Sequence, residues 1–435
     1  MPEVTPALVS AEMGYGHLRA ALPLVEAFGT TLLNADQAPL ADESEALLWA
    51  RVRRIQELLS KPMQLGRLLG NPLGLMDRVT NIPPLHTRGL EEPHLGARAL
   101  DFLIRRGLGR GLVRYLKETG VPLVTTFYAP AIIADRAGCD SYCVVTDADI
   151  NRVWAPMDGK KSRIHYFAPS TRVVRRLAAY GVPRSRITMT GFPLPPELVG
   201  DRDLSILRRD LAARLVRLDP SGLFRELHRD GVERELGSLP ADQEQKPPRM
   251  TFAVGGAGAQ AEMAFQFLPS LKRAILAGQL ELTLIAGIRK DVANTFARAL
   301  EHNELSSQVD VMTASNFDEY YRKFNALMRR TDILWTKPSE LSFYAGLGLG
   351  VVLAKPVGGH ERYNRRWLRE QGVALKQHAP GHAAEWLDEW LNDGTLAAAA
   401  WTGFLRLPKD ATSRIVNYVR SRSPESVRPE VLSRR

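Results

Sequence analysis

Two short glycine-rich segments each follow an apolar run and precede a helix-like pattern. Residues 13–17 (Met-Gly-Tyr-Gly-His) follow residues 7–10, and residues 255–259 (Gly-Gly-Ala-Gly-Ala) follow residues 250–254. Glycines let backbone N–H groups approach a ligand closely, and a helix N-terminus attracts anionic groups. Two such turns suggest two α/β domains that face a shared cleft. The histidine in only one of them indicates that the two halves have different roles.

The imidazole of His17 is the first candidate for proton transfer. Ligands of open parallel sheets bind beyond the carboxyl ends of the strands, so a histidine directly after Gly14, Tyr15 and Gly16 is expected to reach a ligand. The ordinary histidine pKa of about 6.5 suits removal of a proton from a hydroxyl. The alternative interpretation is a polar residue that caps the first helical turn.

Two carboxylates, Asp147 and Asp149, follow the strand pattern of residues 142–146. Carboxyl ends of parallel strands lie at the same edge of a sheet, so these side chains are expected at the same edge as His17. They could orient the imidazole, hold a sugar hydroxyl or act as the base themselves. Alternatively, they cap the turn that follows.

The second glycine segment is a candidate phosphate cradle, formed by Gly255, Gly256, Ala257 and Gly258. Backbone N–H groups of such a turn can hold an anion. The segment lacks the Gly-x-Gly-x-x-Gly dinucleotide spacing, and no Walker lysine follows it. A tight turn without a ligand is the alternative.

Polar residues follow two further strand patterns in the second half. After residues 333–335, Lys337 could meet a phosphate, and Ser339 could cap a helix that begins with Glu340. A glutamate in a first helical turn either complements the helix dipole or reaches ribose hydroxyls. After residues 350–354, the next turn carries His360, Glu361 and Asn364. These side chains could bind sugar hydroxyls; alternatively, they mark only a capped helix start.

The elements that position these residues alternate between strands and helices, which is typical of doubly wound parallel sheets. Strands are predicted in the first half at 7–10, 30–34, 123–127, 141–146, 166–168 and 187–190, and in the second at 250–254, 282–286, 309–312, 333–335 and 350–354. Helices are predicted at 18–28, 43–62, 97–117 and 171–180. The predicted domains are an N-terminal domain (1–196), a charged helical connector (197–249), a C-terminal domain (250–419) and a basic disordered tail (420–435).

The composition and net charge limit which classes of protein and of binding partner are expected. The 435 residues are 45% hydrophobic and 24% charged, which is typical of a globular chain of two or three domains. A net charge of +10 fits a soluble basic protein, an anionic membrane surface or a polyanionic ligand. Nucleic acid is not expected as a partner, because no zinc cluster, recognition-helix signature or aromatic–basic interleaving occurs.

Two cysteines, Cys139 and Cys143, have no companions that would complete a zinc site, so no metal is expected. Their small number fits a reducing cytoplasm. The first residues lack a basic segment followed by an apolar core, so they do not predict a signal peptide. No run of 18 apolar residues occurs, so any membrane contact is expected to be peripheral.

These residues, in this order, resemble the GT-B glycosyltransferases of the MurG, monogalactosyldiacylglycerol synthase and processive diacylglycerol glucosyltransferase group. The lipid glycosyltransferases are the more similar branch. Shared patterns in the first half are Gly-x-Gly-His, Val-Val-Thr-Asp followed by Trp, Tyr-Phe-x-Pro-Ser, Gly-Val-Pro and Thr-Gly-Phe-Pro, at 14–17, 144–147 with Trp154, 166–170, 181–183 and 190–193. In the second half they are Gly-Gly, Thr-Lys-Pro and Lys-Pro-x-x-Gly-x-Glu-x-x-Asn, at 255–256, 336–338 and 355–364.

The resemblance implies a GT-B fold of two Rossmann-like domains facing a central cleft. It implies transfer of a sugar from a nucleotide sugar, with a UDP-sugar as the expected donor, to a lipid-like acceptor, with inversion and without a metal or a separate cofactor. The location it implies is cytoplasmic, peripheral on the inner membrane face. By carry-over His17 is the base and Asp147 supports it, with Gly14, Tyr15, Gly16, Asp149 and Trp154 on the acceptor side. The donor would be bound by Gly255, Gly256, Ala257, Gly258, Lys337, Ser339, Glu340, His360, Glu361 and Asn364.

Three positions depart from the pattern of the family. Asn151 stands where the lipid branch has a histidine, and His360 stands where it has a glutamine. The ribose-binding glutamate falls on Ala345 counted from Lys337, or on Phe343 counted from the later Lys-Pro pair. Glu340, one turn earlier, could replace it. A GT-B binding protein without donor chemistry, or a sugar-nucleotide epimerase, is therefore kept as an alternative to the transferase.

Overall fold

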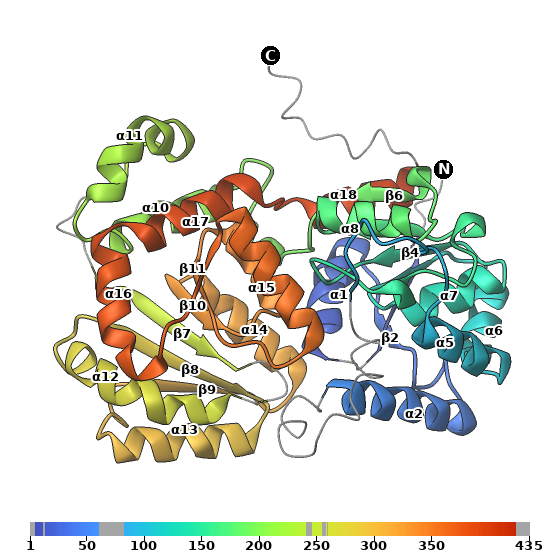
Figure 1. Ribbon diagram of the computed structural model, residues 1–435, viewed down its shortest axis with the longest axis horizontal. Helices are drawn as coiled ribbons and strands as arrows, with labels where there is room; N and C mark the ends of the chain where they lie inside the picture. The colour runs from blue at the N-terminus through green and yellow to red at the C-terminus, as the bar shows by residue number, and fades with distance from the viewer. Residues whose placement is uncertain are drawn as a thin grey trace. The chain divides into compact units, whose positions relative to one another are not determined.

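The computed structural model describes residues 5–11, 14–60, 82–240, 246–254, 258 and 260–422, without the side chains of 51 and 53–60. The described residues fall into two compact units. The first takes its residues from Met1–Leu194, Val357–Asn364 and Pro408–Arg435, and the second from Pro195–Pro356 and Arg365–Leu407. Figure 1 labels many of the helices and strands of both units.

The first unit is built on a parallel six-stranded sheet with the order β2-β1-β3-β4-β5-β6. Its strands are β1 (Ala7–Ser10), β2 (Leu32–Asn34), β3 (Leu123–Thr125), β4 (Ser141–Val144), β5 (His165–Ala168) and β6 (Ile187–Met189). Its helices are α1 (Tyr15–Phe28), α2 (Glu43–Ser60), α5 (Leu95–Arg105), α6 (Arg110–Thr119), α7 (Tyr128–Arg136), α8 (Thr171–Ala179) and α18 (Ala411–Ser421). Short 3₁₀ turns are η1 (Arg152–Trp154), η2 (Gly159–Lys161) and η3 (Arg184–Arg186).

Helices bury both faces of this sheet, which explains its near-continuous apolar strands. On one face, Leu8, Val124, Val144 and Phe167 pack with Leu24 of α1 and with α18, through Ile415, Val416, Tyr418 and Val419. The other face carries the larger cluster, which includes Val9, Leu123, Cys143, Tyr166, Ile133 and Leu177. Helix α18 is therefore part of the core of the first unit.

The second unit repeats the layout with a parallel sheet in the order β12-β11-β10-β7-β8-β9. Its strands are β7 (Arg249–Ala253), β8 (Glu281–Gly287), β9 (Asp310–Thr313), β10 (Ile333–Thr336), β11 (Gly350–Leu353) and β12 (Ala374–Lys376). Its helices are α9 (Pro196–Val199), α10 (Ser205–Arg217), α11 (Leu223–Leu236), α12 (Ala264–Leu276), α13 (Lys290–His302), α14 (Phe317–Met328), α16 (Ala383–Asn392) and α17 (Thr395–Arg406), with the 3₁₀ segments η5 (Ala261–Met263), η6 (Glu340–Leu347) and η7 (Pro380–His382). Helix α15 (Gly359–Gln371) contributes its first residues to the first unit and the rest to the second.

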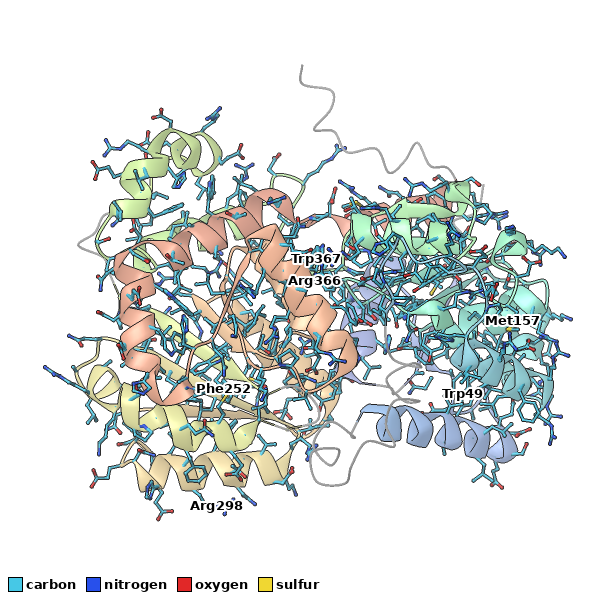
Figure 2. The ribbon with its side chains drawn as sticks, in the orientation of Figure 1. Trp49, Met157, Phe252, Arg298, Arg366 and Trp367 are labelled. Atoms are coloured by element: carbon cyan, nitrogen blue, oxygen red, sulfur yellow. The ribbon has the colours of Figure 1, made fainter. Side chains whose placement is uncertain are left out.

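The side chains of the second unit separate into an apolar interior and a charged surface. Figure 2 shows Phe252, which is fully buried beside Trp335 and Phe267, and Arg298 on the outer side of α13. Arg214 of α10 is buried as a cation: it donates to the backbone oxygens of Thr331 (2.8 Å) and Leu347 (2.7 Å). These bonds fix α10 to the end of η6.

The chain crosses between the units more often than the sequence predicted. The structure groups 357–364 and 408–422 with the first unit, whereas one continuous domain was predicted over 250–419. Residues 197–240 and 246–249, predicted as a separate connector, are grouped with the second unit. Helix α18 continues to Ser421, two residues into the predicted tail, and residues 423–435 lie outside the described residues. A predicted helix over 97–117 is divided at Gly107 and Gly109, whose φ values of 102° and 84° end α5 before α6 begins.

Candidate functional site

In the first unit, the candidate base lies where the strand order reverses. From β1 the chain moves to β2 on one side and to β3 on the other, so the carboxyl ends of β1 and β3 border the crevice in which open sheets bind ligands. His17, in the first turn of α1, follows β1, and Thr126 follows β3. His17 therefore lies at the carboxyl edge of the sheet, and ligand binding there stays a prediction.

Hydrogen bonds fix the His17 ring and its backbone. Its Nδ1 lies 2.7 Å from the carbonyl oxygen of Thr126, which can only accept, so the neutral ring carries its proton on Nδ1. The basic lone pair is then on Nε2. The Thr126 hydroxyl donates to the His17 carbonyl oxygen (3.0 Å) and shares a bond with Ser10 Oγ (3.1 Å). The Thr146 hydroxyl lies 3.4 Å from the same Nδ1.

Aromatic side chains surround this imidazole. The Phe127 ring meets it edge to face, with 5.0 Å between ring centroids, and Trp154 lies at 6.4 Å. Tyr128 contacts both Phe127 (4.3 Å) and Trp154 (5.3 Å). Burial raises the pKa of Tyr128 to about 12, so its phenol is neutral at ordinary pH. The surroundings suit an apolar group beside a reactive hydroxyl.

The glycines before His17 allow the backbone conformation at the start of α1. Gly14 precedes α1 with φ 129°, a conformation that L side chains rarely adopt, and an added Cβ would have no atom within 4 Å. Tyr15 and Gly16 form the first turn and are half-buried. The helix therefore begins next to open space, with N–H groups that could meet a polar ligand.

Asp147 is connected to a segment far along the chain. Asn364 donates to its Oδ1 (3.3 Å) and accepts from the backbone N–H of Ala148 (3.0 Å). Tyr363 adds a reciprocal pair of 3.0 Å bonds with the backbone of Ile82. Asn364, predicted to bind the donor from the C-terminal domain, thus supports the loop that carries Asp147.

Asp149, predicted on the acceptor side, is part of the internal framework. It is 3% exposed, and its two oxygens accept from Nε (2.9 Å) and Nη2 (3.0 Å) of Arg176 in α8. The backbone N–H of Ile150 also donates to it (2.9 Å). Both carboxylate oxygens therefore have internal partners, and the side chain is not presented to a ligand.

The two other predicted residues after β11, Glu361 and His360, differ in burial and in their contacts. Glu361 is 3% exposed and accepts from the backbone N–H groups of Val357 (2.7 Å) and Gly358 (3.3 Å), as a helix-capping carboxylate does. His360 is exposed. Asn151, at the position where the lipid branch has a histidine, accepts from the backbone N–H of Val153 (3.2 Å) and caps the start of η1.

In the second unit, the strand order reverses between β7 and β10, which again predicts a binding crevice at their carboxyl ends. Gly255, Gly256 and Ala257 lie outside the described residues. Gly258 has φ 64°, and a Cβ there would lie 2.6 Å from Val292 Cγ2. Glycine is therefore required at this position of the turn, both for the backbone angle and for space.

Cations follow the carboxyl ends of three strands in this sheet. Lys337 follows β10, Lys355 follows β11, and Arg289 follows β8. The Arg289 guanidinium lies 3.7 Å from the Cβ position at Gly258 and pairs with Asp291 (2.8 and 2.5 Å). Arg289 was not among the predicted site residues, although the basic pair Arg289-Lys290, shortly after the 282–286 strand pattern, is the signal that could have identified it. This edge combines positive charge with a glycine turn and suits a diphosphate.

The segment after Lys337 forms the 3₁₀ helix η6, in which the first residue, Glu340, is half-buried and the residues that follow it are buried. Ser339 precedes it, 8% exposed, and Ser342 is fully buried; neither hydroxyl oxygen has a hydrogen-bond partner. Glu340, half-buried, is the acidic residue of η6. Ala345 and Phe343, the two positions counted for the ribose-binding glutamate, are 0% and 5% exposed. Neither position presents a side chain to solvent, so Glu340 is the remaining carboxylate on this segment.

The described residues contain no group of three or more histidine, cysteine, aspartate or glutamate side chains that could hold a metal ion. Among the helices of the described ranges, none has the length and apolarity to cross a bilayer.

Comparisons with known proteins agree with this geometry at the level of the fold. A family model described as a domain of unknown function (DUF6938) matches two overlapping segments, residues 223–324 and 291–397, which together are less than half of the chain. The sequence is 22% identical over 242 residues to a processive diacylglycerol beta-glucosyltransferase of Bacillus mycoides (strain KBAB4). That match covers 54% of this chain and 49% of the relative, so it spans about half the length of the relative.

Two solved structures share the fold over nearly the whole chain, each with a TM-score of 0.50. One, from Listeria monocytogenes, is assigned as a UDP-N-acetylglucosamine 2-epimerase; it is 11% identical, and the match covers 96% of both chains. The other is the glycotransferase of kitacinnamycin, which is 14% identical, with 98% of this chain and 100% of that chain covered. The GT-B fold predicted from the sequence is confirmed, together with a weak sequence similarity to a lipid glucosyltransferase.

Proposed function

We propose that this chain is a GT-B glycosyltransferase that moves a sugar from a nucleotide sugar, with UDP as the expected nucleotide, to a hydroxyl of a lipid-like acceptor, with inversion. The observation that carries the proposal is the bond of His17 Nδ1 to the Thr126 carbonyl at the point where the sheet order reverses. It fixes the tautomer whose Nε2 accepts a proton, at the edge where open sheets bind ligands.

The chemistry asked of His17 is general-base catalysis. Its Nε2 takes the proton of the acceptor hydroxyl while the oxygen attacks the anomeric carbon, and the bond from that carbon to the nucleoside diphosphate breaks. The sugar is thereby transferred with inversion, and the diphosphate leaves with the electron pair. Asp147, placed by Asn364, is proposed to hold an acceptor hydroxyl. A positioned base contributes about 10²–10⁴-fold to the rate.

The second unit is proposed to bind the donor. The glycine turn at Gly258, the start of η6 and the cations Arg289, Lys337 and Lys355 would hold the diphosphate and stabilise the charge that develops as it leaves. Glu340 is proposed to accept from the ribose hydroxyls in place of the glutamate that the family carries one turn later. No residue in this account requires a metal ion.

The acceptor class rests on the weak similarity to the diacylglycerol glucosyltransferase and on the aromatic surroundings of His17. Exposed arginines in α5, directly after it and in α6 would favour contact with an anionic membrane surface. They are Arg98, Arg105, Arg106, Arg110 and Arg114. A cytoplasmic protein on the inner membrane face is the setting that this proposal requires.

A donor panel tests the proposal. One nucleotide sugar of the panel should raise the thermal unfolding temperature, and the same sugar should be transferred to a diacylglycerol-type acceptor. His17→Ala should lower turnover by at least about 10²-fold and leave the donor shift intact. The matched control is His382→Ala, a histidine whose side chain is 72% exposed. Turnover of His17→Ala at the wild-type rate would remove His17 as the base.

A binding protein without donor chemistry is the second candidate, favoured by the buried Ala345 and Phe343 at the position of the ribose-binding glutamate. It predicts that no nucleotide sugar shifts the unfolding temperature at millimolar concentration. An epimerase would instead convert the donor with no acceptor present, so analysis of the sugar product in that mixture separates it from the transferase.

A further inference from the structure

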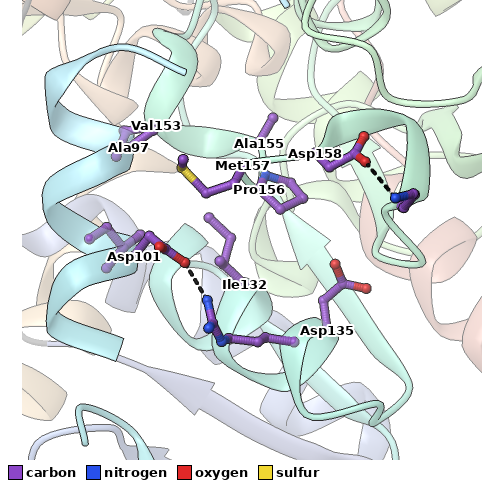
Figure 3. A pocket seen from close by; sticks show the side chains of 12 residues that line it. Ala97, Asp101, Ile132, Asp135, Val153, Ala155, Pro156, Met157 and Asp158 are labelled. Atoms are coloured by element: carbon purple, nitrogen blue, oxygen red, sulfur yellow. Dashed lines mark hydrogen bonds and ion pairs between the residues drawn. The ribbon is translucent and has the colours of Figure 1, made fainter. Parts of the chain in front are cut away.

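The surface of the first unit contains an open hollow between α5, α7 and the segment that follows η1. Its cavity volume is about 200 Å³, and it is open to solvent on one side. Most of its lining is apolar, from Leu100 of α5, Ile132 of α7, and Val153, Pro156 and Met157. Figure 3 shows Met157 and Ile132 near each other, beside the helix that carries Ala97 and Asp101. A lining of this kind favours a hydrocarbon group over a polar ligand.

The charges around the hollow balance one another. Asp101 pairs with Arg136 and with Arg105 (2.8 Å), and Asp158 pairs with Lys161 (3.3 Å). A headgroup with a net charge would therefore meet its own sign as often as the opposite sign. A hydroxyl-bearing headgroup can donate to the carboxylates without disturbing these pairs. A sixth charged group, Asp135, makes three carboxylates beside three cations; it accepts from the backbone N–H of Arg163 (2.9 Å) and offers a further acceptor.

Two elements, η1 and α7, each contribute residues both to the hollow and to the aromatic group around His17. In η1, Trp154 lies beside the imidazole, and its neighbour Val153 lines the hollow. In α7, Tyr128 contacts Trp154, and Ile132, one turn later, lines the hollow. An amphiphile whose chain occupies the hollow is thus held by the same turn and helix that border the candidate base.

We propose that the hollow binds the hydrocarbon chain of an uncharged, hydroxyl-bearing amphiphile. That this amphiphile is the sugar acceptor rests on the proposed function; the binding itself does not. The ligand could reach the hollow as a free monomer or from a bilayer, because the hydrocarbon chain is the same in both.

Calorimetry with n-octyl-β-D-glucoside and n-butyl-β-D-glucoside, both below their micellar concentrations, tests the binding. Each buried methylene is worth about four-fold in affinity, so the octyl compound should bind on the order of 10²-fold more tightly. Equal affinities would overturn the proposal. Octyl phosphate should bind no more tightly than octyl glucoside, and a clear preference for it would refute the uncharged headgroup. Flotation with phosphatidylcholine vesicles containing dioleoylglycerol identifies the bilayer as a source if the protein floats, and the monomer if it does not.

Two methionines provide matched variants. Met157 lines the hollow and Met189 lies on β6, and each is 37% exposed. Met157→Asp should weaken octyl glucoside binding by about ten-fold or more, Met157→Leu should preserve it, and Met189→Asp should have no effect. An unchanged affinity in Met157→Asp would contradict the assignment. The two proposals can fail separately. Absence of sugar transfer would leave the expected binding of octyl glucoside unchanged, and absence of that binding would leave the expected transfer to a short-chain acceptor unchanged.

Discussion

The buried imidazole of His165 predicts a pH-dependent stability of the first unit. His165 is 3% exposed; its Nε2 lies 2.8 Å from Thr188 Oγ1 and its Nδ1 3.0 Å from the Tyr418 hydroxyl of α18. Its ring also stacks on that of Tyr418, at 4.1 Å between centroids. Burial, and secondarily the positive charge of Arg186, lower its pKa from 6.5 to about 3. Protonation therefore works against the contact between α18 and the sheet.

The sign and size follow from linkage. Between the folded pKa of about 3 and the unfolded value of 6.5, the unfolded chain binds a proton that the folded chain does not. Stability from this group is complete above about pH 6.5 and is lost as the pH falls towards 3, at up to about 1.4 kcal/mol per pH unit. Between pH 7 and pH 5 the integrated loss is about 2 kcal/mol.

The perturbation is His165→Gln, which keeps polar atoms near Thr188 and Tyr418 and does not titrate. Urea unfolding, with hydrogen exchange read on peptides from β5 and α18, gives the opening free energy of this region for both proteins. The wild type minus variant difference should fall by about 2 kcal/mol from pH 7 to pH 5, because other titrating groups cancel in the subtraction. A difference that is constant between those pH values would refute a neutral, buried His165.

Three further outcomes are expected from the described contacts. Arg176→Met leaves the Asp149 carboxylate buried without its cation and should cost about 3–5 kcal/mol of unfolding free energy, measured by urea denaturation; a loss below 1 kcal/mol would contradict the buried pair. Gly258→Ala should abolish the donor-induced thermal shift while the first unit unfolds as before, and an undiminished shift would separate this turn from the donor. Burial raises the pKa of the Cys143 thiol well above its usual range, so a thiol reagent at pH 8 should modify Cys139 alone in the folded protein and both cysteines in urea; rapid double labelling of the folded protein would be contrary to this.

The strands could be predicted from the sequence because parallel sheets covered on both faces need continuous apolar runs. The runs at 7–10, 141–146 and 333–335 became β1, β4 and β10 with ends shifted by two residues at most. The partner of α18 could not be predicted in this way. Its apolar stripe shows that one face is buried, but a stripe carries no information about which of two similar sheets covers it.

The candidate base illustrates the same limit at the site. His17 could be identified because glycines, a strand end and a helix start are all signalled by residue type. The group that fixes its tautomer is the carbonyl oxygen of Thr126, and a backbone oxygen has no such signal. The different roles of Asp147 and Asp149 could not be predicted either, because the two residues are of the same type and only two positions apart. Only the location of Arg176, in a helix that follows, decides that Asp149 is internal.

The departure at Ala345 has a packing cause that bears on donor binding. A Cβ on Gly403 of α17 would lie 2.2 Å from the Ala345 carbonyl oxygen, so η6 and α17 approach more closely than larger residues allow. A glutamate at 345 would have to enter this fully buried contact, with the cost of an unpaired buried charge. We therefore expect the proposed recognition of the ribose at the start of η6, through Glu340. Glu340→Gln should accordingly weaken nucleotide binding, as measured by calorimetry, by about ten-fold, while Glu385→Gln, whose side chain is 80% exposed, should not. Equal affinities in the two variants would exclude Glu340 from the donor site.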